Sequence, residues 1–159
     1  MQREIVAQQR ISLERVSESR NFKTGLDIQR ALASKTYAAF VKEDDFRYLV
    51  RNGVVSIVKV EGEVAGLVAF LPDKEDRKLV EHTNLAILPQ FGGNGVGTAA
   101  FNLDLERIRR RGFEYVWGVV HPDNNGSLSI VKRSGFEYVG RAENHYGDKE
   151  PRLIFEKRL

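Results

Sequence analysis

The chain has 159 residues, with 25 Lys and Arg against 22 Asp and Glu, a formal net charge of +3 and no cysteine. This length is typical of one domain, so we assign residues 1–159 to a single domain, with residues 1–9 as a poorly ordered N-terminal extension. The lack of cysteine excludes disulfides, thiolate metal sites and cysteine nucleophiles. No apolar run approaches the roughly 20 residues of a membrane span, and residues 1–9 lack the apolar core of a signal peptide. We therefore expect a soluble cytoplasmic protein.

The first half of the chain predicts three strands and two helices. Alternating apolar residues such as Ile11 and Leu13 indicate a first strand, and Thr24 is a candidate cap for the first helix. Two runs of β-branched residues joined by Glu61-Gly62-Glu63 predict a hairpin. In chain order we expect a strand over 10–16, helices over 25–40 and 44–51, and strands over 54–60 and 64–70.

The second half predicts a strand–helix–strand crossover followed by a helix and two strands. Its first helix has a broad apolar face that includes Val96, Ala100 and Leu103. A near-continuous apolar run over 114–120 predicts a strand that is buried on both faces. The expected elements are strands over 78–88 and 114–120 around a helix over 95–111, a helix over 125–134, and strands over 136–141 and 152–157. We expect the crossover to be parallel and right-handed, and the fold class to be α/β with a mixed sheet.

Two unusual segments follow the two crossover strands, at the strand ends where open α/β sheets bind ligands. The first packs four glycines into residues 92–97 and then opens a helix. Glycines let backbone N–H groups approach a ligand closely, and a helix start attracts anions, so this segment predicts a phosphate site. The pattern does not identify the phosphate compound. It lacks both the Lys-Ser/Thr end of a nucleotide P-loop and the spacing of a dinucleotide fingerprint.

The second segment, residues 121–127, has two interpretations. Asp123, Asn124 and Asn125 are good helix caps, with Ser127 in the same turn, and a cap can also line a site. A run of cations, Arg107 with residues 109–111, likewise has two interpretations. It fits the last turn of a helix better than a nucleic-acid surface, because the net charge is modest.

Together these two segments resemble the GNAT superfamily of N-acetyltransferases. The superfamily's cofactor motif, Gln/Arg-x-x-Gly-x-Gly/Ala, is matched from Gln90 to Gly95, and its later Asn and Gly-Phe are matched by Asn124 and by Gly135-Phe136. The resemblance covers nearly the whole chain. It implies one GNAT-like domain, with a mixed, mostly antiparallel sheet, a central parallel strand–helix–strand crossover and splayed strands.

The resemblance also implies acetyl-CoA as co-substrate. Main-chain groups of Leu85 and Ile87 would pair with the pantetheine arm, and loop amides would hold the pyrophosphate. Arg133 would meet an outer phosphate, or is simply a solvated helix residue. The implied cofactor-binding residues are Leu85, Ile87, Gln90, Gly92, Gly93, Asn94, Gly95, Val96, Gly97, Thr98, Asn124 and Arg133.

The implied catalytic residues are Ser127, Glu81 and Asn124. In many members a tyrosine acts as the acid that protonates the leaving thiolate, and this chain has Val131 at that position. The pattern from Asn124 to Val131 is similar to that of the branch that acetylates ribosomal-protein N-termini. In that branch the serine, here Ser127, is the proposed acid. Asn124 would line the thioester end of the cleft.

Other candidates for the proton-transfer roles remain open. Glu81 matches the basic glutamate of many members, or is a solvated carboxylate. His82 and His121 are alternative bases, and Tyr146 and Tyr138 are rival acids, although Tyr138 is expected to face the core. Strand alternation predicts Glu81, Thr83, Leu85 and Ile87 on one face of the sheet, with His82 and Asn84 on the other.

We expect transfer of acetyl from acetyl-CoA to a primary amine by direct attack in a ternary complex. The alternatives are a non-catalytic acyl-CoA-binding or sensing module and, less favoured, an RNA-binding protein. The acceptor is a small molecule or a protein N-terminus. An acidic bend, Glu43-Asp44-Asp45, either favours a cationic acceptor or only starts a helix. We expect no metal, because the three histidines lack tight ligand spacing, and no membrane or nucleic-acid partner. The sequence leaves open whether the chain forms a homodimer.

Overall fold

The computed structural model describes residues 10–159, which form an α/β fold around one mixed sheet. The predicted N-terminal extension, residues 1–9, lies outside the described residues. The elements are β1 (Ile11–Arg15), α2 (Phe22–Leu32), α3 (Glu43–Asn52), β2 (Val54–Val60), β3 (Glu63–Pro72), β4 (Leu79–Ile87), the short 3₁₀ helix η1 (Pro89–Phe91), α4 (Val96–Arg110), β5 (Tyr115–Val120), α5 (Asn125–Arg133), β6 (Glu137–Ala142) and β7 (Arg152–Arg158). Among residues 10–159, no helix is long and apolar enough to cross a membrane.

The seven strands lie in the order β1-β2-β3-β4-β5-β7-β6. Five of the six strand pairs are antiparallel, and the β4–β5 pair at the centre is parallel. The sheet therefore confirms the predicted mixed, mostly antiparallel architecture with a parallel crossover through α4.

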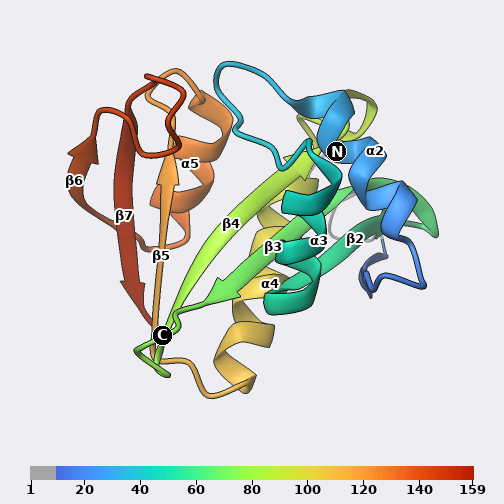
Figure 1. The fold of residues 1–159 in the computed structure, drawn as a ribbon, viewed down its shortest axis with the longest axis horizontal. Helices are drawn as coiled ribbons and strands as arrows, with labels where there is room; N and C mark the ends of the chain where they lie inside the picture. Colours follow the sequence, from blue (N-terminus) through green and yellow to red (C-terminus); the bar gives the residue numbers. More distant parts are fainter. Residues whose placement is uncertain (1–9) are drawn as a thin grey trace.

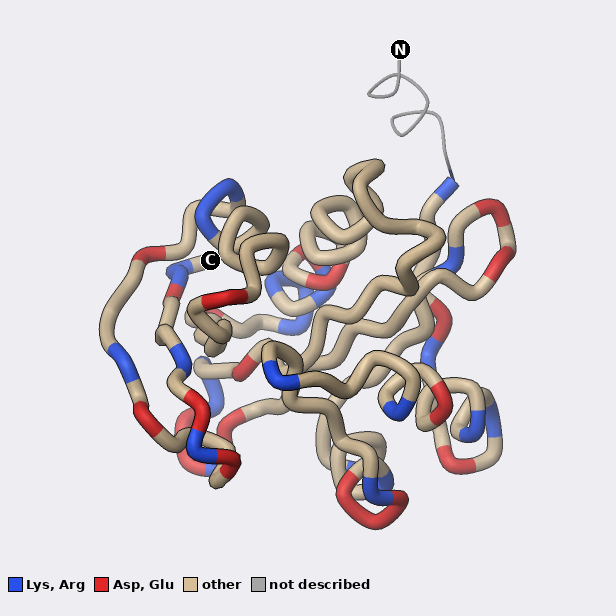
Figure 2. The backbone as a smooth tube through the Cα atoms, turned by 90° about the horizontal axis from the view of Figure 1, so that it is seen from above, with Lys and Arg blue, Asp and Glu red and all other residues tan. Residues whose placement is uncertain are grey.

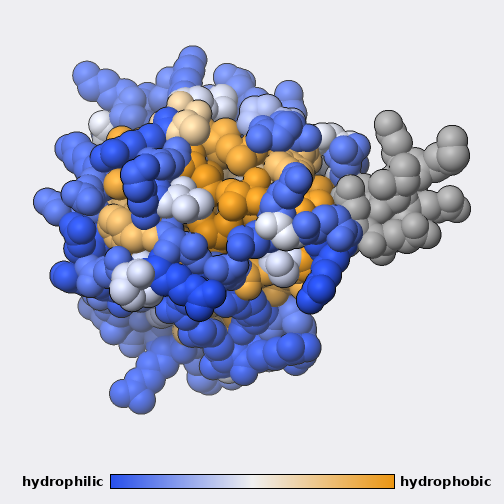
Figure 3. Space-filling model, turned by 90° about the vertical axis from the view of Figure 1, so that its right-hand side faces the viewer, coloured by the Kyte–Doolittle hydropathy of each residue, from blue (hydrophilic) through white to orange (hydrophobic). Residues whose placement is uncertain are grey.

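Helices cover both faces of the sheet (Figure 1). On one face, α2 and α3 bury Leu26, Phe46 and Leu49 against β2 and β3. On the other, α4 buries Phe101 and Ile108 against the centre of the sheet. Charged residues lie mainly around the outside of this arrangement, while the central strands carry few (Figure 2). Figure 3 shows a side of the molecule where apolar residues lie within a hydrophilic rim.

The two parallel strands separate soon after they meet. β4 and β5 are paired over only three positions, from Leu79 with Tyr115 to Glu81 with Trp117. Beyond that point β4 remains paired with β3 and β5 with β7, so the strands diverge toward their carboxyl ends (Figure 1). The predicted splaying is confirmed, and it opens the sheet where a ligand would bind.

A β-bulge in β4 overturns the predicted alternation of side chains. Asn84 pairs with Ala69 and His82 with Phe70, which leaves Thr83 as an extra residue without a register partner. Because a bulge shifts the alternation by one position, His82 lies on the α4 face together with Leu85, not opposite it. The His82 ring contacts Phe101, and Leu85 packs against the core formed with α4, whereas Asn84 bonds to Tyr37 near α2.

The first helix is shorter than predicted. It begins after Asn21, whose φ of 62° ends the preceding turn, and it stops at Leu32, so Thr24 lies inside the helix and does not cap it. The chain is not helical over residues 33–42. There the phenol of Tyr37 donates to Gln29 Oε1 at 2.8 Å and accepts from Asn84 Nδ2 at 2.8 Å. These tertiary hydrogen bonds hold the segment away from the helical path that its sequence allows.

Two expectations about burial are also wrong. Strand β5 is not buried on both faces, because Tyr115 is exposed and residues 117–119 are half-buried beside the opening of the sheet. Tyr138 does not face the core, since 58% of its surface is exposed on strand β6.

The run of arginines forms the last turn of α4. Arg109 and Arg110 both donate hydrogen bonds to Glu106 of the same helix.

We predict that Gly66→Ala lowers the free energy of unfolding by about 1–3 kcal/mol, the usual cost of overpacking. A Cβ at Gly66 would lie 2.1 Å from the carbonyl oxygen of Ala86, so β3 and β4 would have to move apart. Urea denaturation measures the change. Val64→Ala, at a partly exposed position of the same strand, is the control. Equal stability of Gly66→Ala and the parent would show that the close approach of the two strands is not needed.

Candidate functional site

A cavity lies in the opening between β4 and β5. Its walls come from His82 to Leu85 on β4, Gly118 to His121 at the end of β5, and the side chains of Tyr37, Ser127 and Tyr146. The walls therefore come from segments that are far apart in the sequence. We call this space the central cavity.

A groove runs from the central cavity between β4 and α5. It is lined by Leu85 to Ile87, by Gly92, Gly93, Gly95, Gly97 and Thr98 of the glycine-rich loop, and by one face of α5. The groove and the central cavity share Tyr37, Leu85, Asn124 and Ser127. A ligand in the groove can therefore extend into the central cavity.

The glycine-rich loop has the backbone that the sequence predicts for an anion site. Gly93 and Gly95 have φ values of 78° and 79°, in the region that favours glycine. Gly95 is also the N-cap of α4, so the free N–H groups of the first helical turn follow it directly. At Gly97 a Cβ would lie 3.1 Å from Ile130, so this glycine allows α4 to approach α5.

Most of the predicted cofactor residues line the groove, but three side chains do not. Gln90 is exposed in η1, Val96 is buried in the core with 2% of its surface exposed, and Asn94 is not among the lining residues. Gly126, Ser129 and Ile130 line the groove and were missed by sequence reasoning. Their spacing with Arg133, three or four residues apart, matches one face of a helix and was the signal available in the sequence.

Asn124 and Ser127 both take part in capping α5 and line the candidate site, so both interpretations of their segment apply. The Asn124 side chain accepts a hydrogen bond from the backbone N–H of Ser127 at 3.2 Å, so Asn124 is the N-cap of α5. Both side chains also line the junction of the groove and the central cavity. The cap bond uses the backbone of Ser127 and leaves its hydroxyl available for another role.

Glu81 lies where β4 and β5 part, in the last residue pair that joins them. Burial raises the pKa of its carboxyl to about 7 from an ordinary value of 4.5. The nearest cation-forming group is His145, whose Nε2 is 4.0 Å from Glu81 Oε1. Burial and the nearby Arg152 lower the pKa of His145, so the carboxyl gains little stabilisation there at neutral pH. A carboxyl with a pKa near neutrality can exchange a proton at physiological pH.

The two alternative bases are both engaged. His82 Nε2 lies 2.9 Å from Asp104 Oδ2 in the buried interface with α4. His121 Nδ1 accepts from the backbone N–H of Asp123 at 3.0 Å, so the proton of the neutral ring is on Nε2, which donates to Glu150 at 3.1 Å. The His121 ring therefore has no free basic nitrogen, and Nε2 of His82 is engaged by Asp104.

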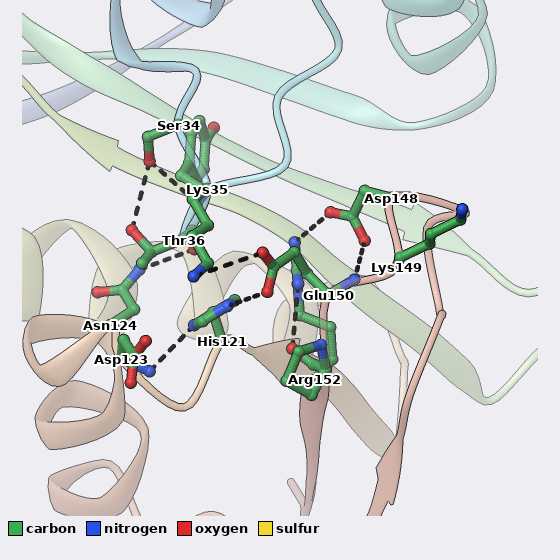
Figure 4. A network of polar contacts seen from close by, with 12 residues as sticks. Ser34, Lys35, Thr36, His121, Asp123, Asn124, Asp148, Lys149, Glu150 and Arg152 are labelled. Carbon is green, nitrogen blue, oxygen red and sulfur yellow. Dashed lines mark hydrogen bonds and ion pairs between the residues drawn. The ribbon is translucent and has the colours of Figure 1, made fainter.

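Figure 4 shows the polar contacts that join the segment around Thr36, which lines the central cavity, to residues near the ends of β5 and β7. Glu150 accepts from His121 and forms an ion pair with Lys35 at 3.7 Å, and Asn124 Nδ2 lies 3.5 Å from the carbonyl oxygen of Thr36. The cap of α5, the start of β7 and the segment after α2 thus meet around one wall of the cavity.

Among the tyrosines, Tyr146 and Tyr37 line the central cavity and Tyr138 does not. Burial raises the pKa of the Tyr146 phenol, and burial is also the main cause that raises the pKa of Tyr37. Sequence reasoning missed Tyr37, because no local motif marks a residue that is positioned by contacts with α2 and β4. Within residues 10–159, His, Asp and Glu side chains form no group of three or more that could hold a metal ion.

Comparison with known proteins gives consistent matches. The model of the acetyltransferase (GNAT) family matches residues 18–136. An uncharacterized N-acetyltransferase of Methanocaldococcus jannaschii is 33% identical over 85 residues, which are 51% of this chain and 38% of that protein. The chain thus spans well under half the length of this curated relative.

Two solved structures share the fold at low sequence identity. A GNAT family acetyltransferase from Elizabethkingia anophelis with acetyl-CoA bound has a TM-score of 0.76 at 14% identity, and the match covers 94% of this chain and 98% of that one. The ribosomal-protein-S18-alanine N-acetyltransferase from Escherichia coli has a TM-score of 0.76 at 15% identity, with 94% of each chain covered.

We predict that Glu81→Gln removes a pH-dependent loss of stability. Because the folded-state pKa is raised to about 7 from 4.5, the folded protein retains the proton that the unfolded chain loses. The free energy of unfolding of the parent therefore falls as pH rises through this interval, by about 2–3 kcal/mol relative to the glutamine variant.

Urea denaturation from pH 4 to 8 tests this prediction, with exposed Glu63→Gln as the control. The control should follow the parent at every pH. A constant difference between Glu81→Gln and the parent would mean that the Glu81 carboxyl has an ordinary pKa.

Proposed function

The chain belongs to the acetyltransferase (GNAT) family, and on that premise we propose that it transfers an acetyl group from acetyl-CoA to a primary amine by direct attack in a ternary complex. The observation that carries the proposal is the junction of the groove with the central cavity at Asn124 and Ser127. The groove offers anion-binding loop amides at one end, and the cavity offers the hydroxyl of Ser127 at the other. Glu81 is not among the residues that line the cavity and lies where β4 and β5 part. We assign the whole described chain to this one acetyltransferase domain.

The groove suits the extended arm of acetyl-CoA. Among residues 10–159, no strand pairs with the edge of β4 that faces β5 beyond Glu81. An unpaired edge can bind an extended molecule as an added strand. We assign this role to main-chain groups of Leu85 and Ile87. The loop amides from Gly92 to Gly97 would hold the pyrophosphate, and Arg133, exposed at the groove wall, would meet an outer phosphate.

Glu81 is the proposed base. An alkylamine is mostly protonated at neutral pH and must lose a proton before its nitrogen can attack the thioester carbonyl. The Glu81 carboxyl, with its pKa near 7 and its place where the strands part, would take that proton through water. The attack creates a tetrahedral oxyanion, and we assign the backbone N–H of Leu85 as its hydrogen-bond donor.

Ser127 is the proposed acid for the departing thiolate. Collapse of the intermediate breaks the C–S bond, and the sulfur leaves as a thiolate that gains a proton. Val131, where many relatives have a tyrosine, lines the same cavity but has no proton to give. Ser127 lies at the junction of the cavity and the groove, whereas Tyr146 lines the central cavity but not the groove. This difference in position favours Ser127.

Release of free thiol from acetyl-CoA in the presence of a panel of primary amines tests the proposed activity. Amine-dependent thiol release with acetylated product supports acetyl transfer. Tight binding of acetyl-CoA with no thiol release for any amine would instead favour the non-catalytic acyl-CoA-binding module, for which the missing tyrosine at Val131 is the supporting observation.

We predict that Gly93→Ala weakens acetyl-CoA binding at least tenfold. A Cβ at Gly93 would meet no atom of residues 10–159 within 4 Å, and it would occupy space at the loop that we propose holds the pyrophosphate. Calorimetric titration with acetyl-CoA measures the change. Gly112→Ala is a matched control, because Gly112 has a φ of 92°, also has no atom within 4 Å of its added Cβ, and lies beyond the opposite end of α4. Equal affinities of the two variants would contradict the cofactor assignment.

We further predict that Ser127→Ala lowers kcat at least tenfold. A general acid usually contributes about 10²–10⁴-fold, and the threshold is set below that range because a thiolate is a tolerable leaving group even without an acid. Affinity for acetyl-CoA should be nearly unchanged, because the cap bond to Asn124 uses the backbone N–H of residue 127 and survives the substitution. Steady-state kinetics of Ser127→Ala and Tyr146→Phe compare the two candidates. If Ser127→Ala keeps the kcat of the parent while Tyr146→Phe loses most of it, the acid is Tyr146 and not Ser127.

A further inference from the structure

A third space opens next to the central cavity. It shares Tyr37, Ala38 and Tyr146 with the central cavity, and its outer wall comes from the segment after α2 and from α3. We call it the outer cavity. A molecule whose nitrogen reaches the central cavity can therefore place its remaining atoms in the outer cavity.

Of the two carboxylates that line the outer cavity, one has no ion-pair partner among residues 10–159. Asp148 lines it but is paired with Arg152 at 2.9 Å. Asp45 also lines it, and among residues 10–159 no cation lies within 4 Å of this carboxylate. The cavity wall therefore carries a net negative charge at Asp45.

The acidic bend does not act as a single cluster. Glu43 and Asp44 lie near Arg47, at 3.7 Å and 3.5 Å, and neither lines the outer cavity. Glu43 and Asp44 therefore pair with Arg47 on α3, and Asp45 is the residue of the acidic bend that lines the outer cavity.

The rest of the outer cavity is apolar and aromatic. Phe40, Val41 and the rings of Tyr48 and Tyr146 line it. Arg152 stacks on the Tyr146 ring at 5.2 Å and Lys74 on the Tyr48 ring at 5.5 Å, but neither cation is among the lining residues. Such a lining favours an apolar spacer that ends in a positive group, because the spacer covers apolar surface and the charge meets Asp45.

We propose that the outer cavity binds the distal, cationic end of the acceptor and that Asp45 is the residue that selects it. The preferred acceptor is a primary amine joined through an apolar spacer to a second positively charged group. This inference rests on the proposed acetyl transfer and adds the class of the acceptor. Asp45 is exposed, so its effect is modest and is screened by salt.

Acetylation of diaminopentane, pentylamine and aminopentanoate, measured by thiol release at saturating acetyl-CoA, tests the inference. The parent should prefer the three probes in that order. Asp45→Asn should raise the KM for diaminopentane about threefold to fivefold, leave the KM for pentylamine unchanged, and lose its effect at high salt. Asp45→Lys should shift the preference toward aminopentanoate.

Asp44→Asn is the matched control, because Asp44 is the adjacent residue on the same helix, its side chain is 99% exposed, and it does not line the cavity. It should behave as the parent with all three probes. Thiol release with pentylamine but no preference for diaminopentane, or equal effects of Asp45→Asn and Asp44→Asn, would overturn this inference and leave acetyl transfer standing. No thiol release with any amine would overturn both.

Discussion

The parting of β4 and β5 is the constraint on which the rest of this structure depends. The two strands stay together for three residue pairs and then separate, while each keeps its other partner, β3 for β4 and β7 for β5. An internal edge without a partner is costly unless something else covers it. Here the central cavity and the groove lie along that edge, so the binding space is a consequence of how the sheet is paired.

The bulge at Thr83 determines which groups face this space. Without the extra residue, His82 would lie on the face opposite Leu85 and away from α4. With it, His82 bonds to Asp104 in the interior, and Asn84 turns toward Tyr37. His82, which the sequence offers as an alternative base, is thereby paired with Asp104 in the interior. Glu81, one residue before it, stays beside the opening of the sheet.

Burial and charge pairing then separate structural from reactive groups. The acidic side chains with strong partners are fixed: Glu150 holds His121 and Lys35, and Asp148 holds Arg152. Among residues 10–159, neither Glu81 nor Asp45 has such a partner, and the two carboxyls differ in their burial. Glu81 is buried beside a neutral histidine, which favours the protonated carboxyl. Asp45 remains in contact with solvent at the wall of the outer cavity, where its charge can act on a ligand.

The sequence by itself determined the order and type of the elements, the glycine-rich loop before α4, and the capping segment at Asn124. These features are local: a period of apolar residues, a run of glycines or a capping side chain acts within a few positions of the chain. The same locality explains why their boundaries were correct to within a few residues for most strands and helices, and why most of the groove residues could be named in advance.

Only the tertiary structure decided the end of α2, the face on which His82 lies, the place of Tyr37 and the division of the acidic bend between Arg47 and the outer cavity. Each of these depends on partners distant in the sequence, such as Asn84 for Tyr37 and Asp104 for His82. Strand register and side-chain pairing are decided by packing between elements, and a shift of one residue moves a side chain to the opposite face. A single sequence does not contain that information in any local pattern.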